Sequence, residues 1–338
     1  MSKKFVPSGE LYPLLFEPIY VERMWGGTLM QETLNRQVPD RGAPIGESWE
    51  LSDRDDADSV VENGPLAGIT LGSLVKYYQQ LLLGKKYTGG RFPLLVKLID
   101  AGDRLSLQVH PDEAACAELG GGAEPKTEMW YIISARSDGT IMAGLSPRAT
   151  RQQLIEKIDS CDVEKLLQVN VSIPGDAYFI PSGTLHAIGA GNLILEIQQN
   201  SDTTYRASDW GRVDASGKPR ELHLDKALAS IDFRNRSNPR VPGVSGVVSH
   251  NRKLPLVSQC RFFTVEELHI ASPWQFNTAN ESFHLLTPVR EAVTISRPYG
   301  EEKIMVDVGR TVMVPANYGE YVVESAAGNV AKVIKSSL

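Results

Sequence analysis

The sequence LSLQVHP at residues 105–111 alternates apolar and polar side chains, which is the pattern of a β-strand. A strand has a side-chain period of two, so Gln108 and His110 point to the same face. A single histidine in a strand is usually a packing or surface residue. Two groups able to bind a metal ion on one strand face indicate a metal site instead.

Two further residues of the same chemistry follow at the ends of apolar stretches. The stretch EMWYII begins with Glu128, and IPSGTLH ends with a second imidazole, His186. Imidazole, carboxylate and amide oxygen together form a ligand set for a divalent transition metal, with zinc first among the candidates. The expected ligands are Gln108, His110, Glu128 and His186. They predict one metal ion per chain, inside a small β-barrel whose inward residues converge on one point.

Composition narrows the class of protein. The chain has 338 residues, of which 42% are hydrophobic and 22% charged, with a net charge of −6. These values are typical of a globular protein with a buried core and argue against a nucleic-acid-binding surface. No apolar run approaches the roughly 18 residues of a membrane-spanning helix, and no secretory leader is evident at the N-terminus. We expect a soluble cytoplasmic protein without nucleic-acid or membrane partners, either a monomer or a weak homodimer.

Periodicity divides the chain into two parts. Helical patterns cover residues 71–83, 111–119, 148–167 and 222–231, whereas short strands with turn residues between them fill residues 262–334. A stretch without periodicity at 235–250 is the expected linker. A weak repeat relates GDAYFIP at 175–181 to GRTVMVP at 309–315, and the second copy lacks a nearby histidine.

We therefore predict a mainly β protein of two related β-barrels. Residues 1–240 would form the catalytic, metal-binding barrel with short helical insertions, and residues 241–338 a metal-free barrel.

Two charged residues interrupt apolar strands. Lys97 lies in the strand predicted at 92–101, and Glu47 in the strand predicted at 45–52. The default expectation is that Lys97 snorkels outward and that Glu47 faces water. The histidines outside the motifs are expected to be surface or packing residues; they are His223, His250, His269 and His284.

The ligand pattern resembles the paired motifs of the cupin family, which implies that the two β-barrels are cupin-like jelly rolls. A closer resemblance lies in longer blocks. These blocks are GESWE at 46–50, LQVHPD at 107–112, KTEMWY at 126–131, PSGTLHA at 181–187, QQNSDTTYR at 198–206 and GKPREL at 217–222. They resemble type I mannose-6-phosphate isomerases in a short bacterial form. The resemblance covers about residues 12–228, and the C-terminal third is similar at the level of the fold alone.

The resemblance implies a zinc-dependent aldose–ketose isomerase that interconverts mannose 6-phosphate and fructose 6-phosphate through an enediol(ate). It puts the metal ligands on the four residues named above and an active-site arginine on Arg206. A guanidinium stabilises developing negative charge without titrating. The proton carrier stays open among Lys126, Glu47, a histidine and a metal-bound water. Lys126 is equally suited to contact the phosphate, and Lys97 is a weaker candidate for either role.

Two other functions use the same residues. Two histidines and a carboxylate also suit Fe(II), so a mononuclear iron cupin oxygenase is one alternative. A metal-bound sugar-phosphate sensor that has lost turnover is the other. Activity with zinc in air excludes the first alternative, and binding without conversion would favour the second.

Overall fold

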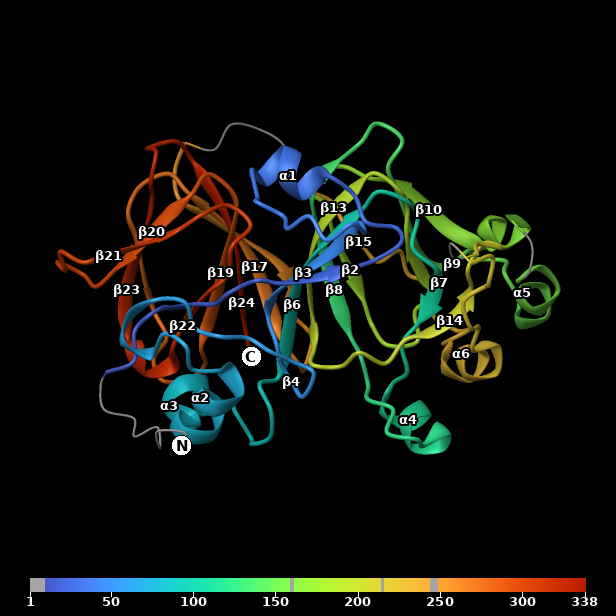
Figure 1. Cartoon of the computed structure of the whole chain (residues 1–338), viewed down its shortest axis with the longest axis horizontal. Coiled ribbons are helices and arrows are strands. Elements are labelled where there is room, and N and C mark those ends of the chain that lie inside the picture. The colour runs from blue at the N-terminus through green and yellow to red at the C-terminus, as the bar shows by residue number, and fades with distance from the viewer. Residues whose placement is uncertain (1–9, 159–160, 214–215, 244–248) are drawn as a thin grey trace. The chain divides into compact units, whose positions relative to one another are not determined.

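The computed structural model describes residues 10–158, 161–213, 216–243 and 249–338 (Figure 1). Its backbone contacts divide the chain into two compact units. The central unit comprises Ile19–Trp49 and Leu94–Ser245, and the terminal unit comprises Met1–Pro18, Glu50–Pro93 and Gly246–Leu338. The boundary at residue 240 stays a prediction. The two N-terminal segments of the terminal unit, however, group with the C-terminal part of the chain, which no single boundary in the sequence can describe.

Two sheets of antiparallel strand pairs build the central unit. The larger sheet has seven strands, in the order β15 (Arg240–Val241), β11 (Ala177–Ile180), β8 (Glu128–Ala135), β13 (Asn192–Gln199), β6 (Leu94–Ala101), β3 (Ile45–Leu51) and β2 (Ile19–Glu22). The smaller sheet has five, in the order β10 (Leu167–Val171), β9 (Thr140–Leu145), β12 (His186–Ile188), β7 (Leu107–Val109) and β14 (Tyr205–Ser208). Strand β15 falls inside the predicted linker.

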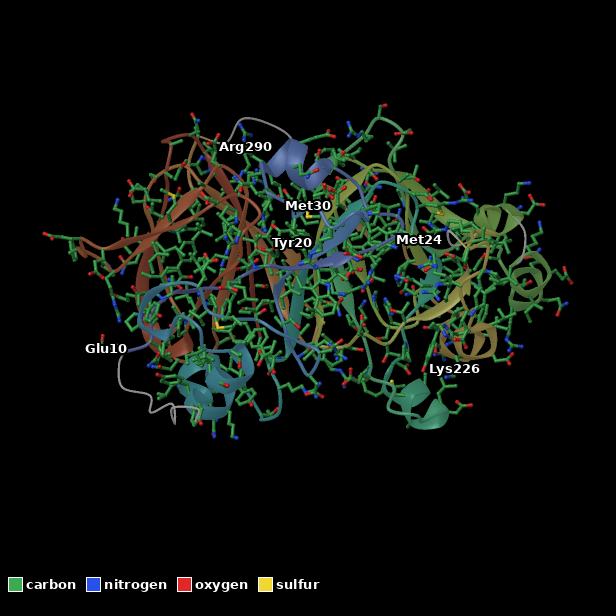
Figure 2. All side chains as sticks on the ribbon, in the orientation of Figure 1. Glu10, Tyr20, Met24, Met30, Lys226 and Arg290 are labelled. Carbon is green, nitrogen blue, oxygen red and sulfur yellow. The ribbon has the colours of Figure 1, made fainter. Side chains whose placement is uncertain are left out.

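The two sheets enclose one core, and helices cover the other face of the smaller sheet. Trp130 and Ile194 of the larger sheet pack with Ile141 and Ile188 of the smaller one. The outer cluster joins the smaller sheet to α5 (Arg151–Lys157), η2 (Cys161–Leu166) and α6 (Leu224–Ser230), which flank it in Figure 1. On the exposed side of α6, the Lys226 ammonium lies 5.6 Å from the Tyr205 ring centre (Figure 2). The predicted helical insertions therefore support the sheet that carries the candidate site.

Side-chain capping explains where these helices begin. Asp112 follows the first motif directly, and its carboxylate accepts the Ala115 N–H at the start of α4 (Glu113–Leu119), which begins two residues after the predicted start at Pro111. Thr150 and Gln153 form a capping box at the start of α5. The helix predicted at 148–167 forms as the two short pieces α5 and η2, and the central unit also contains α1 (Leu29–Leu34).

The terminal unit is a second two-sheet β structure around its own core. Its larger sheet has the order β1 (Leu14–Leu15), β22 (Val312–Val314), β19 (His284–Arg290), β24 (Ala331–Ser337), β17 (Thr264–Ile270) and β16 (Arg252–Val257). The smaller sheet has the order β18 (Trp274–Asn277), β23 (Glu320–Ser325), β20 (Val293–Ser296) and β21 (Lys303–Val306), and β4 (Asp53–Arg54) pairs with β5 (Ala57–Asp58). The helical segments are η1 (Gly64–Leu66), α2 (Leu71–Tyr78), α3 (Gln80–Leu83) and η3 (Ala316–Tyr318).

The prediction of a mainly β chain with two cupin-like barrels is confirmed. Short strands fill residues 262–334 as predicted, and β16 lies before that region. The helix predicted at 71–83 is interrupted at Gln79, whose φ of 46° is incompatible with a continuous helix. In the described parts of the chain, every helix is too short or too polar to cross a membrane.

Candidate active site

The site lies between the two sheets of the central unit. In the smaller sheet, Gln108 of β7 lies opposite His186 of β12 on one side and opposite Arg206 of β14 on the other. Directly opposed residues of antiparallel strands project to the same face, so these three side chains form a row. Glu128, the first residue of β8, faces them from the larger sheet, and His110 follows the end of β7.

A tight turn brings the second motif to the first. Gly183 has a φ of +85° and donates its N–H to the His110 carbonyl over 2.8 Å. A side chain at this position would be strained by the left-handed backbone and would lie 3.2 Å from the Asp232 nitrogen. The glycine three residues before His186 therefore fixes the distance between the two imidazoles.

His110, Glu128 and His186 form a compact buried group. One donor atom from each lies within 4.8 Å of the other two, and all three residues are almost fully buried. His110 Nε2 lies 3.3 Å from one oxygen of Glu128, and His186 Nε2 lies 3.4 Å from the other. His110 Nε2 and Glu128 Oε1 are buried without a hydrogen-bond partner, while Glu128 Oε2 lies 3.0 Å from the Lys126 ammonium. Unsatisfied buried polar atoms are rare in proteins, and a bound cation would satisfy these.

Hydrogen bonds on the opposite ring nitrogens set the tautomers. His110 Nδ1 lies 2.9 Å from the Thr203 carbonyl, and His186 Nδ1 lies 2.8 Å from the Thr184 carbonyl. A carbonyl oxygen only accepts, so each Nδ1 carries the proton and each Nε2 presents a lone pair to the site. This arrangement is the usual one for metal-binding histidines.

The pKa shifts of these three residues favour the binding of a cation. Burial lowers the pKa of His186 to about 3, and it also lowers the pKa of His110, with help from the nearby Lys126 ammonium. Burial alone would raise the pKa of Glu128, but Lys126 and the imidazoles hold it well below its usual value. Both imidazoles are therefore neutral and the carboxylate is ionised at neutral pH, which is the protonation state that metal binding requires.

Gln108 and Lys126 complete the surroundings of this group. Gln108 Nε2 lies 3.2 Å from His186 Nε2, so a half-turn of the amide would direct its oxygen toward the same point. Lys126 Nζ lies 3.0 Å from Glu128 Oε2. Burial alone would lower the pKa of Lys126, but the carboxylates of Glu128 and Glu196 raise it. Lys126 is thus a fixed positive charge, which disfavours it as a base at neutral pH.

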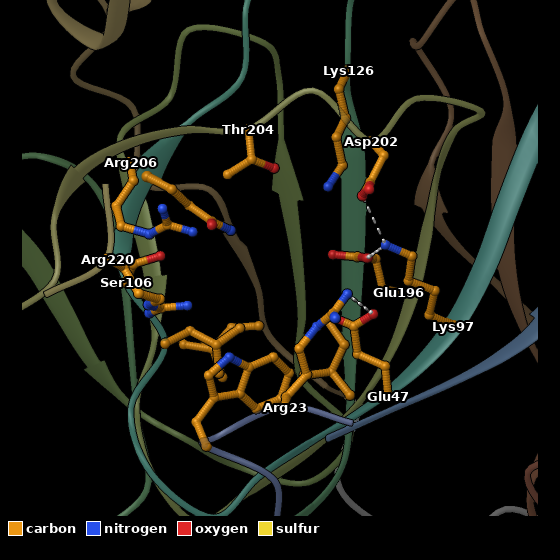
Figure 3. Close-up of a pocket in the computed structure, with 15 residues that line it drawn as sticks. Arg23, Glu47, Lys97, Ser106, Lys126, Glu196, Asp202, Thr204, Arg206 and Arg220 are labelled. Carbon is orange, nitrogen blue, oxygen red and sulfur yellow. Dashed lines mark hydrogen bonds and ion pairs between the residues drawn. The ribbon is translucent and has the colours of Figure 1, made fainter. Parts of the chain in front are cut away.

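A cavity of about 360 Å³ opens beside this group (Figure 3). Its lining residues are Arg23, Trp25, Glu47, Lys97, Ile99, Leu105, Ser106, Gln108, Lys126, Ile188, Glu196, Asp202, Thr204, Arg206 and Arg220. In Figure 3, Arg206 and Arg220 lie on one side, and Lys126, Glu196, Lys97 and Glu47 lie on the other. The structure thus brings together every residue that the sequence suggested for metal binding or catalysis.

The default expectations for Lys97 and Glu47 are wrong. Lys97 is 4% exposed, and its ammonium lies 3.6 Å from Glu196 Oε2 inside the cavity. Glu47 is also buried, pairs with Arg23 over 2.9 Å and accepts the Trp49 indole N–H. Both side chains lie on strands inside the larger sheet and project into the space between the two sheets. They are therefore paired inside the protein rather than solvated.

Glu196 is a site residue that was not predicted. It lies opposite Trp130 and Lys97 on the strands next to β13 and accepts the Trp130 indole N–H over 3.0 Å. Burial raises its pKa to about 7, although the Lys126 ammonium opposes that shift. The sequence did contain one signal for Glu196, which is a carboxylate between Leu195 and Ile197 in an otherwise apolar strand. Its pairing with Lys97 was not visible without the sheet order.

Arg206 has few neighbours of opposite charge. Its Nη1 donates to the Glu221 carbonyl over 2.8 Å, and its Nε is buried without a hydrogen-bond partner. Burial and the neighbouring Arg220 lower the pKa of its guanidinium. Its backbone N–H donates to His223 Nδ1, so His223 is a packing residue of this loop. The alternative to an active-site role for Arg206 is a structural ion pair with Asp202 or Asp209. The Arg206 guanidinium forms neither pair.

Comparison with known proteins decides the family. The model of the catalytic domain of type I phosphomannose isomerase matches residues 14–129. The mannose-6-phosphate isomerase ManA of Bacillus subtilis is 35% identical over 320 residues, which cover 93% of this chain and 96% of that protein. The chain belongs to the mannose-6-phosphate isomerase family.

Other members of the mannose-6-phosphate isomerase family agree with this assignment. The enzyme of Streptococcus mutans is 35% identical over 259 residues, which cover 77% of this chain and 79% of that one. The crystal structure of the mannose 6-phosphate isomerase from Bacillus subtilis superimposes with a TM-score of 0.85 at 31% identity. It covers 97% of this chain and all of that one, so the family fold includes both units.

Proposed function

We propose that this protein interconverts mannose 6-phosphate and fructose 6-phosphate, with one zinc ion held by Gln108, His110, Glu128 and His186. The observation that supports this proposal most strongly is the buried group of two neutral imidazoles and one ionised carboxylate, whose unsatisfied atoms face one point beside the cavity. Two nitrogens and carboxylate or amide oxygens are ligands that zinc accepts. The proposed substrate is a sugar phosphate.

The reaction moves a carbonyl between C1 and C2 through an enediol(ate), and its main demand is stabilisation of negative charge. A bound zinc ion would supply Lewis acidity toward the carbonyl and the adjacent hydroxyl oxygen. Arg206 lies in the row next to Gln108, so its guanidinium is close enough to the ligand group to stabilise charge on the same oxygens. Lys126 keeps Glu128 ionised and adds a second fixed positive charge.

Glu196 is the proposed proton carrier. A group that both accepts and returns a proton works best when its pKa is near the working pH, and the pKa of Glu196 is about 7. The other pocket carboxylates are less suited. Burial alone would raise the pKa of Glu47, but Lys97 and Arg23 hold it below its usual value. The Lys97 ammonium is placed to favour the ionised form of Glu196 between the two transfers.

The test is a coupled assay of mannose 6-phosphate conversion before and after chelation, with zinc, iron or no metal added back. Turnover that chelation abolishes and zinc restores in air is the expected result. Absence of turnover in the zinc-loaded protein would refute the isomerase proposal, and turnover with iron alone would refute zinc as the working metal. Cytoplasmic location and a monomer or weak homodimer stay predictions, which fractionation and light scattering would measure.

A further inference from the structure

A closed ring of hydrogen bonds lies on the Nδ1 side of His110, the side away from the other metal-ligand candidates. The His110 Nδ1–H donates to the Thr203 carbonyl over 2.9 Å. The hydroxyl oxygen of Thr203 accepts the Glu124 N–H over 3.0 Å. The ring closes through the backbone, because Lys126 donates its N–H to the carbonyl of Pro111, the residue after His110. The carbonyl that fixes the His110 tautomer is therefore itself held by a neighbouring segment.

Ser201 forms a second link between the same two segments. Its hydroxyl oxygen accepts the Thr203 N–H over 3.2 Å, and its O–H donates to the Glu124 carbonyl over 3.0 Å. Ser201 is 1% exposed, so water does not compete for these two hydrogen bonds. Without this hydroxyl, Thr203 would keep only the hydrogen bond between its own side chain and the Glu124 N–H.

The chain just before Ser201 is anchored as well. The buried Gln198 donates its amide N–H to the Ser201 carbonyl. Gln199 donates its backbone N–H to the Thr127 carbonyl over 3.0 Å, and its side-chain oxygen accepts the Thr127 N–H over 2.8 Å. Thr127 directly precedes Glu128, so residues 198–203 are bonded to the segments of two ligand candidates. We call residues 198–203 the clasp.

The other imidazole of the ligand group is held in a different way. His186 Nδ1 donates over 2.8 Å to the carbonyl of Thr184, which lies two residues earlier in the same turn. The partner of His110, in contrast, is 93 residues away in the sequence. The His186 tautomer therefore depends on local backbone, whereas the His110 tautomer depends on the clasp. A change in the clasp should affect His110 and spare His186.

We propose that Ser201 and the hydroxyl of Thr203 are positioning residues for the metal ligand His110. They hold the Thr203 carbonyl in place, so that Nδ1 of His110 carries the proton and Nε2 keeps its lone pair for the metal ion. This inference rests on the proposed function for the presence of a metal ion. The tautomer of His110, however, is measurable in the metal-free protein.

Long-range 1H–15N correlation spectra of the metal-free protein, labelled with 15N-histidine, report the tautomer of each imidazole. His110→Gln and His186→Gln assign the two sets of signals. In the wild type, we expect His110 to be a single Nδ1–H tautomer. In Ser201→Ala, the Nε2–H tautomer of His110 should appear at about 10% or more, because the hydrogen bond to the Thr203 carbonyl is weakened. The His186 signals should not change.

Zinc affinity, measured by competition with a chromophoric chelator, is the second readout. Ser201→Ala should bind zinc about 10- to 100-fold more weakly than the wild type. Thr203→Val removes the hydroxyl that accepts the Glu124 N–H and should change in the same direction. Thr203→Ser keeps that hydroxyl and should stay within about twofold of the wild type.

Ser59→Ala is the matched control for Ser201→Ala. Ser59 is also buried, and its hydroxyl oxygen accepts the Ser52 N–H over 2.9 Å, but both serines belong to the terminal unit. The control therefore removes a similar buried hydrogen bond outside the clasp. It should leave the zinc affinity and both tautomers as they are in the wild type.

Several results would overturn the role of the clasp. One is a zinc affinity within about twofold of the wild type in both Ser201→Ala and Thr203→Val. Another is a His110 tautomer that is unchanged in both variants. Equal changes at His186, or an equal loss of affinity in Ser59→Ala, would also overturn it, because they would show a general loss of structure. If Ser201→Ala does not fold, the comparison of Thr203→Val with Thr203→Ser carries the test.

The same measurements separate this inference from the proposed function. Wild-type protein that binds zinc through the clasped His110 but does not convert mannose 6-phosphate would refute the isomerase and leave the clasp standing. Wild-type protein that binds no zinc would refute the metal site. The His110 tautomer in Ser201→Ala and Thr203→Val would then decide the role of the clasp by itself.

Discussion

The pH dependence of zinc binding tests the protonation state of the two imidazoles. An imidazole with an ordinary pKa near 6.5 is only about one quarter neutral at pH 6, so two such ligands would lose about 16-fold in metal affinity between pH 8 and pH 6. Here burial lowers the pKa of His186 to about 3, so this imidazole stays neutral at pH 6, and burial also lowers the pKa of His110 below its usual value. We expect the affinity to fall by less than about fourfold over this interval, which is the loss that one imidazole with an ordinary pKa would cause.

Competition with a chromophoric chelator measures this affinity at each pH, with the pH dependence of the chelator determined separately. Glu196 titrates within the same interval, because burial raises its pKa to about 7. Repeating the series with Glu196→Gln isolates the contribution of the imidazoles. A fall of tenfold or more in both proteins would refute the assignment of neutral, Nδ1-protonated histidines in the metal-free state.

Three further predictions concern charge at the site. Arg206→Ala should lower kcat for mannose 6-phosphate by about 10²- to 10³-fold in steady-state assays, since it removes transition-state charge stabilisation; a change below threefold would argue against that role. Glu196→Gln should lower kcat by about 10²- to 10⁴-fold and remove the pH limb near 7, and a retained limb would assign it to another group. Glu128→Gln in chelated protein should destabilise the fold by about 3–5 kcal/mol, because it leaves Lys126 buried beside an uncharged amide. Thermal unfolding measures this change against Asp162→Asn, which breaks an exposed pair and should not shift the midpoint; equal shifts in the two variants would contradict it.

The sequence predicted the ligand group because its geometry is mostly local. Period-two alternation puts Gln108 and His110 on the same face, and the glycine turn at 183 leads to the second imidazole. Asp112 and Thr150 determine the starts of two helical insertions through side-chain caps, which are also local. The two-barrel organisation follows from the strand spacing, but the grouping of residues 50–93 with the C-terminal part does not. That grouping depends on contacts between segments far apart in the chain.

By itself, the sequence determined the fold class and the metal-ligand candidates, which depend on short-range patterns, and its resemblance to a known family pointed to Arg206. Only the tertiary structure decided which charged strand residues are inside. Nothing in the strands of Lys97, Glu47 and Glu196 prevents these side chains from facing water, yet a second sheet covers their face, so each must be paired. The position of Arg220 in the cavity depends on a loop that folds back so that Arg220 contacts Asp209, and no periodicity in the sequence predicts this contact. Burial is a property of what packs against a strand, and a strand's own residues do not specify its partner.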